Sequence, residues 1–485
     1  MPAARIKIAA FYVVSIIFLA LNFYLVVSRD SLWLAVLPVV FGLVILAFYR
    51  LDYLLLLIVF FTPLSLPLKE LIPGLSFDMN LPTEPLVVGV LFYVVLKLAT
   101  RPRIDQNLLK HPVTIAVGFY LAWMLLTSLT STMLVVSLKY WLSKVWFVVA
   151  FYLLGVWLLK NPRNFYRFSL LYALGFVPVI AYAWWRQSGY GFFDNHAANF
   201  VMNPFFKDHT SYGAMLVFFM PPLAAVSLKP NLKKSLRFLA GSLFGLLIIA
   251  LIFSYTRAAW LSLFVALGLL GVLLLKIRFK VVLISVVIVV GGLFAFQNQL
   301  VAMLEKNKQQ SSAELSGHLN SISNVSTDAS NVERLNRWNS AWAMFLEKPL
   351  FGWGPGTYMF QYAPFQKTDL RTIISTNSAD GGNAHSEYLG PLAESGILGT
   401  ISFLLVVLAI FRTGFRVYGR AKSKEDKVLT LSVLMALVSY FTHGFLNNFL
   451  DTDKAAIPVW FFVAVLVVLD LKLKDPSFPE KIELD

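Results

Sequence analysis

Two arginines and one histidine are the side chains of this chain best suited to chemistry. Arg257 lies between two long apolar runs, Arg334 lies in a polar segment of roughly residues 298 to 388, and His385 lies near the end of that segment. A guanidinium group keeps its charge and offers paired donors to a phosphate or diphosphate. An imidazole titrates near neutrality, so it can accept a proton from a hydroxyl group. Together they predict a site that binds an anionic group and acts on a hydroxyl.

Each of these residues also has a simpler interpretation. Arg257 could snorkel from the end of a membrane helix, as long basic side chains often do. Arg334 and Arg337 could lie on a solvated helix face, and His385 could cap a helix. Arg334 and Trp338 stand four residues apart, however, so one helical face would present a cation beside an aromatic ring.

Three further patterns resemble binding motifs but favour structural roles. Asp451-Thr-Asp453 has the spacing of a metal-binding motif, which recurs by chance. The glycine-rich stretch 352–356 lacks the preceding strand of a dinucleotide site, so we expect a turn. The acids and histidines of residues 187–210, including Asp208 and His209, could bind zinc or calcium, but loop or substrate-lining roles are more typical. We therefore predict no metal and no cofactor.

The elements that must position these side chains are membrane helices. Of the 485 residues, 58% are hydrophobic and 14% are charged, which leaves more apolar surface than a soluble protein of this size carries. Continuous apolar windows of about 17 to 22 residues, which do not alternate as barrel strands would, recur along the chain. We predict an all-α polytopic membrane protein with about 12–14 transmembrane helices. The windows centre near residues 17, 40, 60, 91, 121, 150, 175, 219, 245, 266, 288, 401, 437 and 463.

The net charge of +15 sets the predicted topology. A nucleic-acid site needs Lys and Arg clustered on a folded polar surface, whereas here they stand at the ends of apolar runs. The positive-inside rule then places both termini in the cytoplasm and the 298–388 segment outside. The first apolar run, about Ile6 to Val27, is long enough to remain as an anchor. The chain has no cysteine, which excludes disulfides and thiolate catalysis.

Three regions follow from this topology. Residues 1–297 hold about eleven spans, residues 298–388 form a large outer loop, and residues 389–485 hold the C-terminal spans and a cytoplasmic tail. Within the loop, residues 305–330 lack periodicity, whereas Asn331 to Leu346 predict an amphipathic helix that ends before Pro349. The segments 187–210 and 254–257 would face the same side as the loop.

Four motifs resemble the O-antigen ligase and polymerase superfamily. They occur in the family's order over the C-terminal half of the chain and are Ser254-Tyr-Thr-Arg-Ala-Ala-Trp260, Arg334-Leu-Asn-Arg-Trp338, Glu347-Lys-Pro-Leu-Phe-Gly-Trp-Gly-Pro-Gly356, and Asn383-Ala-His-Ser-Glu-Tyr-Leu389 with Glu394-Ser-Gly396. The resemblance implies a GT-C-like glycosyltransferase of the bacterial inner membrane, with the large loop in the periplasm. Such an enzyme takes glycan from an undecaprenyl diphosphate carrier and uses neither a metal nor a nucleotide sugar.

The resemblance also implies roles for individual residues. Arg257 and Arg334 match the diphosphate-binding arginines, and His385 matches the histidine that accepts the acceptor's proton or orients its hydroxyl. Arg337 has no firm counterpart, and Ser386 stands where the family usually has Asn. We further expect substrate contacts from five residues: Arg337, Trp338, Glu387, His209 and Asp208.

The expected reaction is transfer of O-antigen glycan to a lipid A core sugar, which makes the chain a ligase of lipopolysaccharide biosynthesis. A polymerase would instead use another carrier-linked repeat as acceptor, and a protein O-oligosaccharyltransferase would use a protein. From a different class, a transporter of a lipid-linked or anionic solute would show charged or broken helices near mid-membrane. The expected partners are the lipid-linked glycan donor, the acceptor and membrane lipid, without nucleic acid.

Overall fold

The computed structural model covers most of the chain. It describes residues 2–31, 33–72, 74, 78–100, 105–278, 280–281, 284, 329–371, 375–376, 382–475 and 477–478, without the side chains of 2–11 and 329–331. The span predicted near residue 288 and almost all of the loop predicted over residues 305–330 lie outside the described residues.

The described residues form helices and one short β-hairpin, and the protein is an all-α polytopic membrane protein. Ten helices among the described residues are long and apolar enough to cross a membrane. In chain order the elements are α1 (Pro2–Arg29), α2 (Trp33–Tyr49), α3 (Leu51–Phe61), β1 (Leu66–Pro67), α4 (Leu68–Leu71), β2 (Asn80–Leu81), α5 (Thr83–Thr100), α6 (Gln106–Leu109), α7 (Pro112–Leu129), α8 (Leu134–Phe147), a π-helical stretch (Val148–Leu153), α9 (Leu154–Leu158), α10 (Arg163–Ser188), α11 (His209–Leu228), α12 (Lys234–Phe253), α13 (Arg257–Leu274), α17 (Ala329–Glu347), α18 (Tyr358–Gln361), α19 (Leu389–Arg420), α20 (Lys424–His443) and α21 (Asp453–Lys474). Single 3₁₀ turns cover Ala197–Asn199, Ala363–Phe365 and Thr368–Leu370.

One of the predicted spans is shorter than expected. The window near residue 40 corresponds to α2, with 17 residues, whereas the window near residue 60 corresponds to α3, with only 11 residues. At about 1.5 Å per residue α3 rises only about 16 Å, roughly half of the hydrocarbon thickness. Pro63 follows shortly after α3 and cannot continue a helix, so the apolar run is divided there. The helix α17 agrees with the predicted amphipathic helix, although it begins at Ala329.

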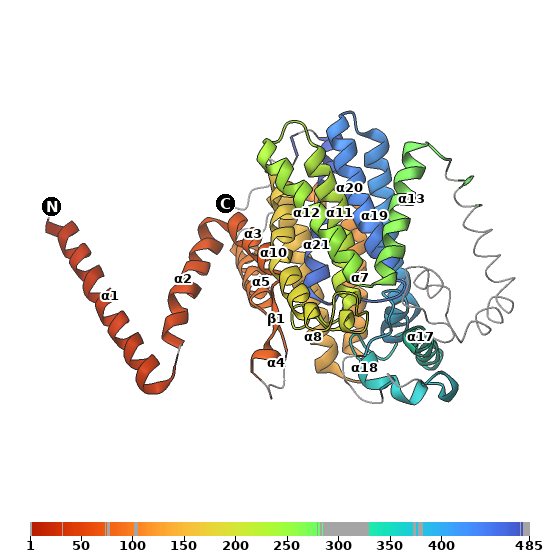
Figure 1. The fold of residues 1–485 in the computed structure, drawn as a ribbon, viewed down its shortest axis with the longest axis horizontal. Helices are drawn as coiled ribbons and strands as arrows, with labels where there is room; N and C mark the ends of the chain where they lie inside the picture. The colour runs from red at the N-terminus through yellow and green to blue at the C-terminus, as the bar shows by residue number, and fades with distance from the viewer. Residues whose placement is uncertain are drawn as a thin grey trace. The chain divides into compact units, whose positions relative to one another are not determined.

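The chain divides into two compact units. The first, Met1–Leu57, contains α1, α2 and most of α3, and the second, Ile58–Asp485, contains the remaining elements. All residues expected in the site belong to the second unit. Within it, α17 and α18 lie at one end of the helix bundle, which is the lower end in Figure 1.

The core of the second unit lies where α10, α11 and α21 meet. Helix α21 is buried along nearly its whole length, from Asp453 to Val468. The rings of Phe168 and Phe461 stack with centroids 3.9 Å apart, and those of Tyr172 and Phe219 stack at 4.1 Å. Since lipid solvates apolar side chains as well as protein does, close packing of this kind holds membrane helices together.

Ion pairs tie the helices at the end of the bundle opposite α17. Arg416 on α19 donates two hydrogen bonds of 2.8 Å to Asp470 on α21, and His111 Nε2 lies 3.2 Å from the same carboxylate. Lys229 pairs with Glu425 between the end of α11 and the start of α20. Basic side chains therefore gather where α19 and α21 end and where α12 and α20 begin.

The glycine-rich stretch forms the predicted turn and fastens α17 to α19. Gly352, Gly354 and Gly356 have φ values of 68°, 112° and 74°, and Gly396 interrupts α19 with φ 69°. Three backbone hydrogen bonds join the two segments: Trp353 N–H to Ala393 O at 3.1 Å, Gly354 N–H to Glu394 O at 2.8 Å, and Ile397 N–H to Pro349 O at 2.9 Å. These positive φ values favour glycine because a Cβ atom would be strained there.

We predict that Gly354→Ala destabilises the protein by at least about 1–2 kcal/mol, since a left-handed residue gains a Cβ atom. That Cβ would also overlap the side chain of Ser131. The matched control is Gly268→Ala on α13, where nothing lies within 4 Å of the new Cβ atom. Thermal unfolding of the detergent-solubilised proteins measures both. Equal melting temperatures for the two variants would show that the turn does not need glycine at position 354.

Candidate functional site

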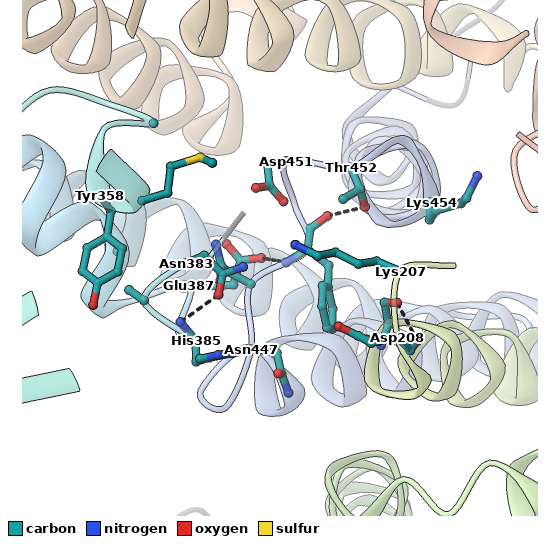
Figure 2. Close-up of a pocket in the computed structure, with 18 of the residues that line it drawn as sticks. Lys207, Asp208, Tyr358, Asn383, His385, Glu387, Asn447, Asp451, Thr452 and Lys454 are labelled. Carbon is teal, nitrogen blue, oxygen red and sulfur yellow. Dashed lines mark hydrogen bonds between the residues drawn. The ribbon is translucent and has the colours of Figure 1, made fainter. Parts of the chain in front are cut away.

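A cavity of about 830 Å³ lies at the end of the bundle where α11, α19 and α21 begin and α20 ends. Figure 2 shows Tyr358, Asn383 and His385 on one side of it and Asp208 and Lys454 on the other, with Asp451 and Thr452 between them. Its lining mixes cations with carboxylates. The cations are Lys69, Lys144, Lys207, Arg337 and Lys454, and the carboxylates are Glu70, Asp78, Asp208, Glu387, Glu394, Asp451 and Asp453.

His385 lines this cavity in a strained backbone conformation. Its φ of 49° lies in the left-handed region, which is unusual for a residue with a side chain. Its N–H donates to Asn383 Oδ1 at 3.0 Å, and its carbonyl accepts a hydrogen bond from Trp338 Nε1 at 3.3 Å. Trp338, expected to bind substrate, therefore supports the backbone of His385 and is not among the residues lining this cavity.

The surroundings of His385 keep its ring neutral. Burial lowers the pKa of His385 to about 4, and the positive charges of Arg334, Arg337 and Lys207 act in the same direction. Asp208 opposes them only in part. The imidazole is thus uncharged at neutral pH and has a nitrogen able to accept a proton.

Arg337 is buried against the cavity, so the interpretation that it lies on a solvated helix face is wrong. Only 3% of the residue is exposed, because α17 packs this side against Tyr358, Tyr362 and Thr376. Its Nε donates to Glu333 Oε1 at 2.6 Å, its Nη2 donates to Thr376 Oγ1 at 3.0 Å, and the guanidinium lies 3.9 Å from the Tyr362 ring centroid. Its Nη1 is buried without a hydrogen-bond partner among the described residues.

Arg257 and Arg334 are not among the residues that line the cavity. Arg334 Nε donates to Leu446 O at 3.3 Å, in the loop between α20 and α21. His209, the first residue of α11, lies within electrostatic range of both guanidinium groups. The structure therefore brings together side chains from the segments 187–210, 254–257 and 298–388. This agrees with the prediction that all three segments face the same side of the membrane.

A close helix contact sets the position of Arg257. Thr256 lies between the end of α12 and Arg257. Its Oγ1 donates a hydrogen bond of 2.7 Å to the His209 carbonyl. Gly213 on α11 makes room for this contact, because a Cβ atom there would lie only 2.9 Å from the Thr256 side chain. Small residues permit such approaches between membrane helices. A larger residue at position 213 would displace Thr256 and with it Arg257.

Asp208 lines the cavity and caps α11. It accepts hydrogen bonds of 2.7 Å from Ser211 N–H and from Thr210 Oγ1. Burial alone would raise the pKa of Asp208, but these hydrogen bonds outweigh it and the net pKa is lowered. Asp208 is thus a carboxylate that partly balances the neighbouring cations, and its neighbour His209 is not among the cavity-lining residues.

Glu387 fixes the loop that closes one side of the cavity. One carboxylate oxygen, Oε1, accepts hydrogen bonds from Tyr440 Oη at 2.6 Å and from the N–H groups of Phe449 and Leu450 at 2.8 Å each. Burial raises the pKa of Glu387, and the charge of Lys144 opposes that shift. Glu387 lines the cavity, but its observed hydrogen bonds are to the Tyr440 hydroxyl and to backbone N–H groups of the protein itself.

Several cavity residues were missed by sequence reasoning. Lys144 is buried within α8, with its Nζ 4.9 Å from the Tyr140 ring centroid. A lysine inside an apolar run is a signal that could have found it. Lys207 directly precedes Asp208, a residue already expected to contact the substrate, so its position is also a signal that could have found it. Asp451 and Asp453 both line the cavity, and Asp453 also accepts hydrogen bonds from Ser65 and Thr83.

Comparison with known protein families identifies one matching region. Residues 242–404 match the family model described as O-Antigen ligase. This region runs from α12 into α19 and includes Arg257, Arg334, Arg337 and His385. A comparison with curated proteins gives no match.

We predict that His385→Gln reduces the loss of stability on acidification. The unfolded imidazole titrates near 6.5 and the folded one near 4, so between these values only the unfolded chain gains the proton. Stability contributed by neutral His385 is complete above about pH 6.5 and is lost as pH falls toward 4. From pH 7 to pH 5 the wild type should lose about 2 kcal/mol more than the variant.

Denaturant unfolding in detergent at the two pH values measures this difference. Replacement of the exposed His196 by Gln is the matched control and should leave the wild-type pH dependence unchanged. An identical pH dependence for His385→Gln and the wild type would contradict the assignment of a buried, neutral ring.

Proposed function

We propose that this chain, of which residues 242–404 match the O-antigen ligase family model, transfers glycan from undecaprenyl diphosphate to a lipid A core sugar. The observation that carries this proposal is the group of cations around a neutral His385. Arg334, Arg337 and Lys207 all contribute to the electrostatic field at that ring. A lipid-linked diphosphate is the anion that a membrane enzyme of this superfamily would place there.

The cations would stabilise the negative charge of the leaving group in a glycosyl transfer. When the bond between the anomeric carbon and the diphosphate oxygen breaks, the electron pair and the negative charge stay on the diphosphate. Arginines held in a water-poor cavity stabilise that charge without reorganising, and they do more for the transition state than for the substrate. Arg337 offers its buried Nη1 donor in the cavity itself, and we assign Arg334 and Arg257 to the same diphosphate group.

His385 is proposed to receive the proton of the acceptor. The acceptor oxygen forms its bond to the anomeric carbon as its proton passes to the neutral imidazole. A pKa of about 4 makes His385 a weak base in the cavity on its own. A bound diphosphate would offset the positive charges of the arginines and raise that pKa, so the base becomes effective when the donor is present. A single in-line displacement of this kind inverts the anomeric centre.

The distribution of basic residues supports a periplasmic position for the cavity. Arg412, Arg416 and Arg420 on α19, Lys233, Lys234 and Arg237 around the start of α12, and Lys424 and Lys427 on α20 lie toward the opposite end of the bundle. By the positive-inside rule that end faces the cytoplasm of the bacterial inner membrane. The C-terminus then follows α21 into the cytoplasm, and the N-terminus is assigned to the same side from the sequence.

We predict that Arg334→Ala, Arg337→Ala and His385→Ala each reduce glycan transfer about 100-fold or more, since each removes a preorganised group that acts on the transition state. Transfer is measured with the purified proteins, undecaprenyl-diphosphate-linked glycan and core lipopolysaccharide, by the shift of the product on a gel. Arg163→Ala, an exposed arginine at the opposite end of the bundle, is the matched control. Near-normal transfer by all three cavity variants would refute this site.

Deletion of the gene distinguishes the possible acceptors. A ligase predicts intact lipid A core that lacks long glycan, because no other step joins the two. Core that carries a single repeat would indicate a polymerase, and loss of glycan from protein would indicate an oligosaccharyltransferase. An unaltered surface glycan with lost solute uptake would overturn the proposal in favour of transport.

A further inference from the structure

The loop between α20 and α21 presents two unused hydrogen-bond acceptors to the cavity. Asn448 Oδ1 and Asp451 Oδ1 are buried and have no hydrogen-bond partner among the described residues. Both residues line the cavity. Buried acceptors are nearly always paired in folded proteins, and leaving one unpaired is costly, so two in one loop indicate a missing donor.

The conformation of this loop does not depend on those two side chains. Glu387 Oε1 holds the N–H groups of Phe449 and Leu450, and the Glu387 N–H donates to the Gly444 carbonyl at 2.8 Å. Thr452 Oγ1 donates to the Phe449 carbonyl at 2.8 Å. The scaffold therefore fixes Asn448 and Asp451 in place while leaving their acceptor oxygens available.

The charge around Asp451 defines what can bind there. Glu387, Glu394, Tyr120 and Tyr140 lie within electrostatic range of its carboxylate and line the same cavity. Three carboxyl groups outnumber Lys144, whose charge acts on Glu387 and Glu394, so they disfavour a phosphate. Acceptor oxygens call for a ligand that donates hydrogen bonds. Within the described residues, no group of three or more His, Asp or Glu side chains is arranged to hold a metal ion.

We infer that Asn448 and Asp451 form a subsite for the hydroxyl groups of a sugar ring. The inference rests on the proposed function, because it places a sugar beside the cations that would hold the diphosphate. Carboxylate and amide oxygens accept from sugar hydroxyls, and the tyrosines Tyr120 and Tyr140 add aromatic surface to the same lining. Positive charges from Arg334, Arg337 and Lys207 act on His385, whereas the carboxyl groups of Glu387 and Glu394 act on the surroundings of Asp451.

The sugar could belong to the donor glycan or to the acceptor, and kinetics separates these sources. Asp451→Asn keeps the shape of the side chain but removes its charge, and Asn448→Ala removes the second acceptor. Each variant should raise the KM of one substrate about 10- to 100-fold, as expected for lost hydrogen bonds to a buried charged group, with a smaller effect on kcat. A raised KM for the lipid-linked glycan assigns the subsite to the donor, and a raised KM for core lipopolysaccharide assigns it to the acceptor.

Direct binding tests the subsite independently of transfer. The probes are the lipid-free repeat oligosaccharide and the lipid-free core oligosaccharide of the source cells, titrated calorimetrically into the full-length protein in detergent. The wild type should bind one of them, and Asp451→Asn should weaken its Kd about tenfold or more while leaving the melting temperature unchanged. The matched control is Asp426→Asn, an exposed acid at the opposite end of the bundle.

The outcomes separate the two proposals. Transfer with unchanged KM and Kd values in both variants would overturn the sugar subsite and leave the glycosyltransferase standing. Oligosaccharide binding that depends on Asp451, in a protein that transfers no glycan, would support the subsite and refute the proposed reaction. Absence of both binding and transfer would refute both.

Discussion

The cations that act on His385 repel one another, and the fold holds Arg337 and Lys207 in the same cavity lining. Repulsion between like charges grows as water is excluded, so such an arrangement is unfavourable unless fixed partners offset it. Glu333 and Tyr362 hold Arg337 in place, and Asp208 supplies a carboxylate opposite His385. The diphosphate of the proposed donor would meet these groups already in position.

The motifs that identify the superfamily serve mainly to build this scaffold. The glycines at 352–356 and at 396 adopt backbone conformations that let two segments join through their main chains. Glu387 organises the loop between α20 and α21, and Trp338 holds the carbonyl of His385. Only some of the motif residues line the cavity. Others, such as Trp338 and Gly354, make contacts with the backbone that hold the site in shape.

Hydropathy and periodicity predicted the helical membrane architecture, the helix α17 and the glycine turn, because those features depend on neighbouring residues. The same reasoning overestimated the length of α3, where Pro63 follows the helix, and its alternative of a solvated Arg337 is wrong. Periodicity gives the face of a helix on which a residue lies but not what packs against that face. Lys144 and Asp451 line the cavity because segments far apart in the chain come together there. A local sequence pattern cannot predict such contacts.

Binding of undecaprenyl diphosphate without any attached sugar tests the central claim most directly, because it isolates the anion from the rest of the reaction. Calorimetric titration of this lipid into the detergent-solubilised protein should show saturable binding that weakens with added salt. Removal of the Arg334 or Arg337 guanidinium should weaken it about tenfold or more, as expected for lost charge-assisted hydrogen bonds. Equal affinities for the wild type and both arginine variants, or equal affinities for the diphosphate lipid and its uncharged alcohol, would contradict the account.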